Sequence, residues 1–178
     1  MSEMLTTRPI TLLLALTLLG CNPVGEPNAS DVVRQFYAAT INANVTGAPT
    51  AEQLATLSPY LSDTLRSLLA AARKRSEAEA AKSPDEKPSF VEGDLFSSLF
   101  EGPNAVEVLP DSVRGEHRVA TVKMTANAAN PPVTWVDRAI LVKQGDRYVI
   151  DDIEYGGAWD FANKGSLRAT LVSGITAP

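Results

Sequence analysis

Few side chains in this sequence belong to the types that enzymes use as nucleophiles or metal ligands. The 178-residue chain contains one cysteine, Cys21, and one histidine, His117. A single cysteine excludes an intramolecular disulfide and a cysteine-based zinc finger, and a single histidine excludes a site built from several imidazoles. The sequence contains no glycine-rich phosphate loop, serine elbow or metal-ligand spacing. We therefore expect no metal and no cofactor, and we expect His117 to be a surface residue.

The surroundings of Cys21 predict a covalent modification. An apolar run at residues 10–19 is too short to span a bilayer and has the length of a signal-peptide core, with Arg8 before it. The run ends in Leu18-Leu19-Gly20-Cys21, which resembles the lipobox of bacterial lipoproteins. This resemblance implies cleavage before Cys21 and attachment of a diacylglycerol to its thiol. The alternative is an ordinary secretory signal followed by a chance cysteine.

These features predict three parts of the chain: a signal peptide at 1–20, a flexible tether at 21–29 and a single domain at 30–178. Two prolines and a glycine in the tether disfavour regular structure. The lipid would hold the domain on the cell envelope, facing the periplasm. Asn22 follows the cysteine where an aspartate favours the inner membrane in bacterial lipoproteins, so the outer membrane is the favoured destination.

The remaining sequence predicts helices first and strands afterwards. Apolar residues recur at helical spacing in the first half, and Thr50-Ala51-Glu52-Gln53 is typical of a capping box. Ser30 is the expected N-cap of the first helix. The expected elements are helices at 31–42, 51–57, 62–81 and 166–172, strands at 105–109, 116–125, 133–143 and 147–155, and a long loop at 83–103 packed against the body. This order predicts an α+β fold with an antiparallel sheet.

Three motifs carry a resemblance to a known family. They are Val33-Arg34-Gln35-Phe36-Tyr37, Glu92-Gly93-Asp94-Leu95-Phe96-Ser97-Ser98 and Tyr148-Val149-Ile150-Asp151-Asp152-Ile153-Glu154-Tyr155. In this order, over residues 31–172, they resemble the bacterial lipoproteins of domain of unknown function 3828. The order of elements resembles the cone-shaped nuclear transport factor 2-like (cystatin-like) superfamily. The resemblance implies helices packed on a curved antiparallel sheet, and it implies no activity.

The turn between the last two strands predicts which side chains share a face. With Gly145 and Asp146 as a two-residue loop, Gln144 pairs with Arg147 and Ile140 with Asp151. One face then holds Val136, Arg138, Ile140, Val142, Val149, Asp151, Ile153 and Tyr155, and the other holds Trp135, Asp137, Ala139, Leu141, Lys143, Tyr148, Ile150, Asp152 and Glu154. Because the first set is mostly β-branched and apolar, we expect it to face the helices.

A candidate pocket follows from that register. Arg138 and Asp151 would be diagonal neighbours on a half-buried face, where charges need partners. In the cone fold, ligands bind between the helices and the sheet, so these two residues would line a pocket with Tyr37, Phe36 and Tyr155 near its mouth. The alternative is a salt bridge that closes the edge of the core without a ligand.

The opposite face provides a candidate interaction surface. Trp135, Leu141, Tyr148 and Ile150 would be exposed there, and exposed aromatic residues on a sheet indicate a protein partner or a homodimer. Three acids, Asp137, Asp152 and Glu154, would share that face, either in water or around a cation.

The net charge of −5 excludes nucleic acid as the expected partner. We therefore favour non-catalytic binding of a protein partner or a small hydrophobic ligand by an envelope protein held through the lipid on Cys21. Two alternatives stay open. One is an immunity lipoprotein against a toxin delivered to the periplasm. The other is a cone-fold isomerase or dehydratase, with Asp151 as base beside Tyr37 or Tyr155.

Overall fold

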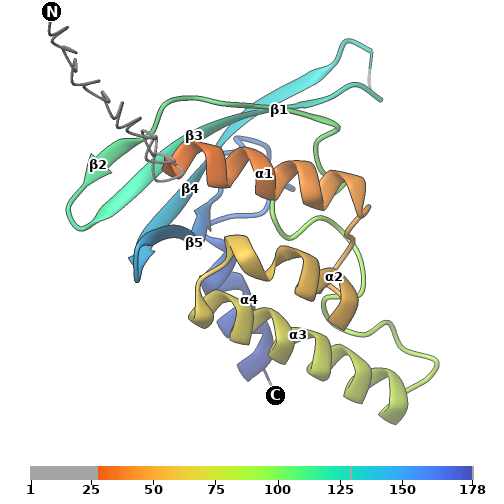
Figure 1. Ribbon diagram of the computed structural model, residues 1–178. Helices are drawn as coiled ribbons and strands as arrows, with labels where there is room; N and C mark the ends of the chain where they lie inside the picture. The colour runs from red at the N-terminus through yellow and green to blue at the C-terminus, as the bar shows by residue number, and fades with distance from the viewer. Residues whose placement is uncertain (1–27, 129, 178) are drawn as a thin grey trace, which may run out of the picture.

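The computed structural model describes residues 28–128 and 130–177. The predicted signal peptide, Cys21 and most of the predicted tether lie outside these residues. The fold is α+β, as expected, with four α-helices packed against a five-stranded antiparallel open sheet (Figure 1). The helical elements are α1 (Ala29–Asn42), α2 (Ala51–Leu57), the 3₁₀-helix η1 (Ser58–Tyr60), α3 (Asp63–Lys82) and α4 (Leu167–Thr176), and the strands are β1 (Ala105–Val108), β2 (Ser112–Arg114), β3 (His117–Ala126), β4 (Val133–Gln144) and β5 (Arg147–Glu154).

Side-chain caps fix where the helices begin. The capping box at Thr50 and Gln53 is present at the start of α2, which confirms that prediction. Ser62 caps α3 by accepting a hydrogen bond from the backbone N–H of Leu65. The predicted cap of the first helix is wrong: Asn28 caps α1, and the buried Ser30 hydroxyl donates instead to the carbonyl of Leu109. Ser30 therefore ties α1 to the segment before β2.

The sheet has the strand order β1-β3-β4-β5, and β2 also pairs with β3. Strand β2 was not among the predicted elements. It has only three residues, and all three side chains are exposed, so burial does not alternate along it. Arg114 pairs with His117 across one turn, and Gln144 pairs with Arg147 across the other. Because Arg118 pairs with Leu141, both turns lie at the same end of the sheet, which we call the hairpin end.

The predicted register is confirmed at the turn and fails further along the strands. Gln144 pairs with Arg147 and Leu141 with Ile150, but Ile140 pairs with Asp152 rather than with Asp151. A β-bulge therefore makes Asp151 an extra residue. Beyond the bulge every side chain of β5 changes face, because side chains alternate along a strand.

Along β4 the face predicted to pack against the helices is the wrong one, whereas Ile153 of β5, beyond the bulge, does lie in the core as predicted. Trp135, Asp137, Ala139 and Leu141 are buried in the core, whereas Val136 is exposed on the outer face. The prediction failed because it placed the mostly β-branched set that contains Val136 toward the helices and assumed that the carboxylate of Asp137 is solvated. Asp137 is instead fully buried, and hydrogen bonds compensate its charge.

Helices cover one face of this sheet. Figure 1 shows α1 lying across the strands, with α4 beside α3 near β5. The core includes Phe36 and Tyr37 from α1, Leu65 and Leu69 from α3, and Met124 from β3. Among the described residues, no helix combines the length and the apolar character needed to cross a membrane.

Candidate functional site

The long loop between α3 and β1 carries the polar centre of the domain. Residues 95–99 of this loop are buried, which confirms that the loop packs against the body. A buried loop must find partners for its backbone groups, because an unpaired buried carbonyl is costly. Two tyrosines supply such partners. The hydroxyl of Tyr37 donates to the carbonyl of Phe96 at 2.9 Å, and the hydroxyl of Tyr155 donates to the carbonyl of Leu95 at 2.6 Å.

Asn163, in the segment between β5 and α4, satisfies three further carbonyls of the loop. Its side-chain amide donates to Asp94 at 3.2 Å and to Ser97 at 2.8 Å, and its backbone N–H donates to Ser98 at 2.9 Å. Each of the five consecutive carbonyls from residue 94 to residue 98 thus accepts a hydrogen bond from a distant part of the chain. We call residues 94–98 the clamped segment.

The carboxylate of Asp137 fixes the clamped segment to the sheet. One of its oxygens accepts the backbone N–H of Ser98 at 2.8 Å and the indole N–H of Trp135 at 3.2 Å. The other accepts the Ser98 hydroxyl and the backbone N–H of Gly156 at 2.8 Å. With four donors, this fully buried carboxylate is saturated and has no free lone pair that points at a substrate.

Asp94 is the member of the cluster that faces open space. One oxygen accepts the backbone N–H of Phe96 at 2.6 Å, and the other touches Gly102, where a Cβ atom would collide with it. Gly102 has a φ of 73°, which also favours glycine. The half-buried Asp94 borders a cavity of about 210 Å³, whose other lining residues are Thr40, Ile41, Asn44, Glu101, Gly102, Pro103 and Asn104.

Burial and like charge shift the pKa values in this cluster. Burial raises the pKa of Asp94 from 3.8 to about 7, and the negative charge of Asp137 adds to the rise. Burial also raises the pKa of Tyr37 and that of Tyr155, so both hydroxyls stay protonated and remain donors. Asp94 can therefore exchange a proton near neutral pH, whereas the tyrosines serve as hydrogen-bond donors to the loop.

Removal of one clamping hydroxyl tests this assignment. We expect Tyr37→Phe to lower the free energy of unfolding by about 1–2 kcal/mol, because the buried carbonyl of Phe96 loses its donor. The measurement is a urea titration followed by tryptophan fluorescence. Tyr60→Phe is the matched control, since among the described residues no hydrogen bond is made by the Tyr60 hydroxyl. Equal losses in both variants would contradict the role of Tyr37.

The five residues of the predicted pocket fall into two groups. Phe36, Tyr37 and Tyr155 lie together around the clamped segment; the rings of Phe36 and Phe96 meet edge to face at 5.1 Å. Phe36 and Tyr37 are buried, so they do not form the mouth of a pocket. The predicted neighbours Arg138 and Asp151 are not brought together.

Asp151 belongs to a structural junction instead. Its carboxylate accepts the Ser62 hydroxyl at 2.6 Å and forms an ion pair with Arg168. These contacts join the start of α3 and the start of α4 to the bulge in β5. Arg138 is exposed on the outer face, where its partner across the strands is Glu154. The predicted Arg138–Asp151 pair is therefore wrong, because the bulge moves the two side chains apart.

The predicted interaction face is not exposed. Trp135, Leu141 and Ile150 are buried and Tyr148 is half-buried, because the helices cover that side of the sheet. The three acids do not share a face either: Asp137 points into the core, while Asp152 and Glu154 lie beyond the bulge. Glu154 forms an ion pair with Arg114, and Asp152 accepts the backbone N–H of Arg168.

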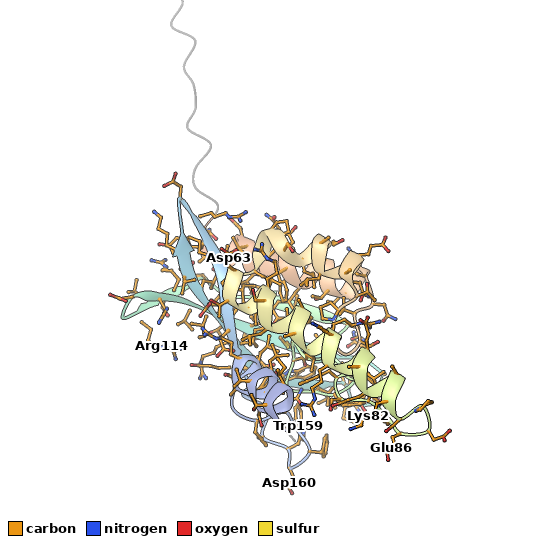
Figure 2. The ribbon with its side chains drawn as sticks, turned by 90° about the horizontal axis from the view of Figure 1, so that it is seen from below. Asp63, Lys82, Glu86, Arg114, Trp159 and Asp160 are labelled. Atoms are coloured by element: carbon orange, nitrogen blue, oxygen red, sulfur yellow. The ribbon has the colours of Figure 1, made fainter. Side chains whose placement is uncertain are left out.

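Aromatic side chains do reach the surface in the segment between β5 and α4. Trp159 contacts Trp135 edge to face at 5.7 Å, and Phe161 stacks on Trp159 at 6.1 Å while 72% of its surface stays exposed. Figure 2 shows Trp159 and Asp160 at one extremity of the molecule. This segment was not predicted from the sequence, and neither were the roles of Asp94, Asp137 and Asn163. The motif containing Asp94 was the available signal, and isolated Asn163 offered none.

A groove of about 510 Å³ lies along the uncovered face of the sheet. Three consecutive residues from each of β1, β3 and β4 line it, and those that lie on the outer face include both charged and apolar side chains, whereas Met124 and Trp135 are buried in the core. Glu107 and Lys123 lie 3.4 Å apart there, next to the exposed Val136. The groove is lined by Ala105, Val106, Glu107, Lys123, Met124, Thr125, Thr134, Trp135 and Val136. This surface can hold a ligand through mixed apolar and polar contacts.

One known protein bears on the identity of the chain. Over 150 residues the chain is 26% identical to the uncharacterized lipoprotein YbjP of Escherichia coli (strain K12), a stretch that covers 84% of this chain and 78% of that protein. No family model matches the chain. No solved structure matches it. The likeness to YbjP supports a bacterial lipoprotein, held on the cell envelope by a lipid anchor.

Proposed function

We propose that this chain is an envelope protein, lipidated on Cys21, that acts by non-catalytic binding. The observation that carries the anchor is the sequence Leu-Leu-Gly-Cys at residues 18–21, joined to the likeness to a lipoprotein. The proposal includes a signal peptide at 1–20, a tether at 21–29 and one domain at 30–178 that faces the periplasm. It also includes membership of the domain of unknown function 3828 family and of the nuclear transport factor 2-like superfamily.

Non-catalytic binding is favoured because the polar side chains in the core form hydrogen bonds within the fold. Asp137 is saturated by four donors, and the hydroxyls of Tyr37 and Tyr155 hold the clamped segment. These groups support the fold, and Asp137 and Tyr37 are buried away from any substrate. The groove on the outer face remains open, and we propose it as the binding surface in place of the buried face predicted from the sequence.

Lipidation is tested by metabolic labelling of the full chain in a bacterial host with a palmitate analogue. We expect the label on the protein, with a shift into the detergent phase on phase partitioning. Cys21→Ser is the control, and it should lose both properties because the chain has no other thiol. A wild-type protein without label, or a label that persists in Cys21→Ser, would contradict the anchor.

The binding surface is tested by mass spectrometry of what the anchored protein retains when it is purified from its own envelope. Val136→Glu places a charge in the groove, and Val172→Glu places the same charge on α4, where 48% of the valine is exposed. We expect the first variant, and not the second, to lose a stoichiometric ligand or partner. Retention in both variants would contradict the assignment of the groove.

A further inference from the structure

The two ends of the sheet differ in their distance from the start of the domain. Ser30 donates to the carbonyl of Leu109 and to Asp111 at 3.1 Å each, directly before β2, so α1 begins on the side of the hairpin end. The start of α3 lies there too, because the backbone N–H of Asp63 donates to Gln144 at 3.2 Å. Figure 2 shows Asp63 well separated from Trp159 and Asp160, which follow the opposite end of β5.

The length of chain between Cys21 and Asn28 limits how the domain faces a bilayer. Seven residues span at most about 25 Å when fully extended. A domain of this size is roughly 40 Å across, from the scaling of the radius of gyration with chain length. A lipid on Cys21 would therefore keep Asn28 within about 25 Å of the membrane, which is less than the width of the domain, and the start of α1 lies on the side of the hairpin end.

Arg147 and Val113 are the side chains of the hairpin end best placed to meet a lipid surface. Of the four basic side chains in residues 111–118 and 143–147, Arg114 pairs with Glu154 and Arg118 pairs with Asp111, so these two do not contribute a free charge. Arg147 is exposed and makes no ion pair within the part of the chain that the structure describes. Val113 on β2 is 68% exposed, so it presents an apolar side chain between charged neighbours. Basic side chains with an apolar neighbour are typical of segments that lie on a lipid surface.

We propose that the hairpin end docks on the anionic headgroups of the leaflet that holds the acyl chains, with Val113 at the headgroup level. The segment with Trp159 and Phe161 then points away from the membrane. This inference rests on the proposed lipidation of Cys21 and adds the orientation of the anchored domain.

The sole thiol allows a test that does not depend on lipidation in cells. The chain from residue 21 to residue 178 is coupled through Cys21 to a maleimide phospholipid in vesicles of phosphatidylcholine and phosphatidylglycerol with brominated acyl chains. Val113→Trp reports on the hairpin end and Phe161→Trp on the opposite end, each corrected for the two native tryptophans with the unsubstituted protein. We expect at least twofold stronger quenching of the tryptophan at position 113. Equal quenching, or stronger quenching at position 161, would overturn the orientation.

A charge reversal tests the role of the anionic headgroups. Arg147→Glu should weaken the quenching at position 113 in vesicles that contain phosphatidylglycerol. Lys82→Glu, an equal change at the far end of α3 (Figure 2), should leave the quenching unaltered. Equal effects of both reversals would overturn the electrostatic contact. A failure of palmitate labelling in cells would instead contradict the proposed anchor. The vesicle experiment would still test the orientation, because it attaches Cys21 to the lipid chemically.

Discussion

Asp137→Ala should destabilise this protein by about 3–5 kcal/mol, because it leaves the donors of Ser98, Trp135 and Gly156 without an acceptor in the core. For a domain of about 150 residues this corresponds to a fall in Tm of roughly 10–15 °C. The measurement is thermal and urea unfolding followed by the fluorescence of the two tryptophans. Trp135 is an especially direct reporter, since its indole donates to the carboxylate that is removed.

Two further variants separate the hydrogen bonds from the loss of volume. Asp137→Asn keeps the shape but turns an amide NH₂ toward two donors, so a loss of about 2 kcal/mol or more should remain. Asp160→Ala removes an exposed carboxylate and should change stability by less than about 0.5 kcal/mol. If Asp137→Ala costs no more than Asp160→Ala, the saturated carboxylate is not what holds the clamped segment on the sheet.

Asp94→Asn should change how stability depends on pH. The pKa of Asp94 is about 7 in the folded protein and near 3.8 when the chain is unfolded, so between these values the folded state binds the extra proton. The contribution of this proton to the free energy of unfolding is fully present below pH 4 and is lost as the pH rises through 7. Over that window we expect wild type to lose roughly 2–4 kcal/mol relative to Asp94→Asn.

The difference between the two proteins isolates Asp94, because all other titrating groups are shared. An asparagine retains the oxygen that accepts the backbone N–H of Phe96 and has no proton to release. Urea titrations at pH 4.5, 6 and 8 give the difference directly. A constant difference across these pH values would show that the folded-state pKa of Asp94 is not raised.

Local signals in the sequence predicted the elements well. The capping box at Thr50 and the turn at Gly145 and Asp146 each act within a few residues. Such features are independent of what the segment later packs against, so the helices and the long strands begin and end close to their expected positions.

The facing of the sheet could not be predicted in the same way. Asp137 and Arg138 are neighbours, so one of them had to point inward, and the outcome depended on donors 39 and 19 residues away in Ser98 and Gly156. The bulge at Asp151 then moved the predicted partner of Arg138 away. The carboxylate of Asp151 pairs instead with Arg168 on α4, and the residue pattern of the strands gives no sign of this contact. Tertiary contacts therefore determine both the orientation of Asp137 and the position of Asp151, and no local sequence pattern predicts these contacts.

The candidate site shows the same division. The motifs that contain residues 92–98, Tyr37 and Tyr155 could be identified in the sequence, but the hydrogen bonds between them could not. Tyr37 and Tyr155 meet only because the loop passes between α1 and the end of β5. Asn163 lies in a segment without regular structure, so neither periodicity nor spacing distinguished it.

The contacts of Asn163 also bear on the order in which this protein folds. Asn163 supplies donors to three of the five carbonyls of the clamped segment, and Tyr37 and Tyr155 supply one donor each. The side-chain contacts among these join residues that are 59 to 69 positions apart in the sequence. Contacts between residues far apart in the sequence form slowly, because the loop between them must first close. We therefore expect the clamped segment to be among the last parts of the domain to reach its native hydrogen bonds.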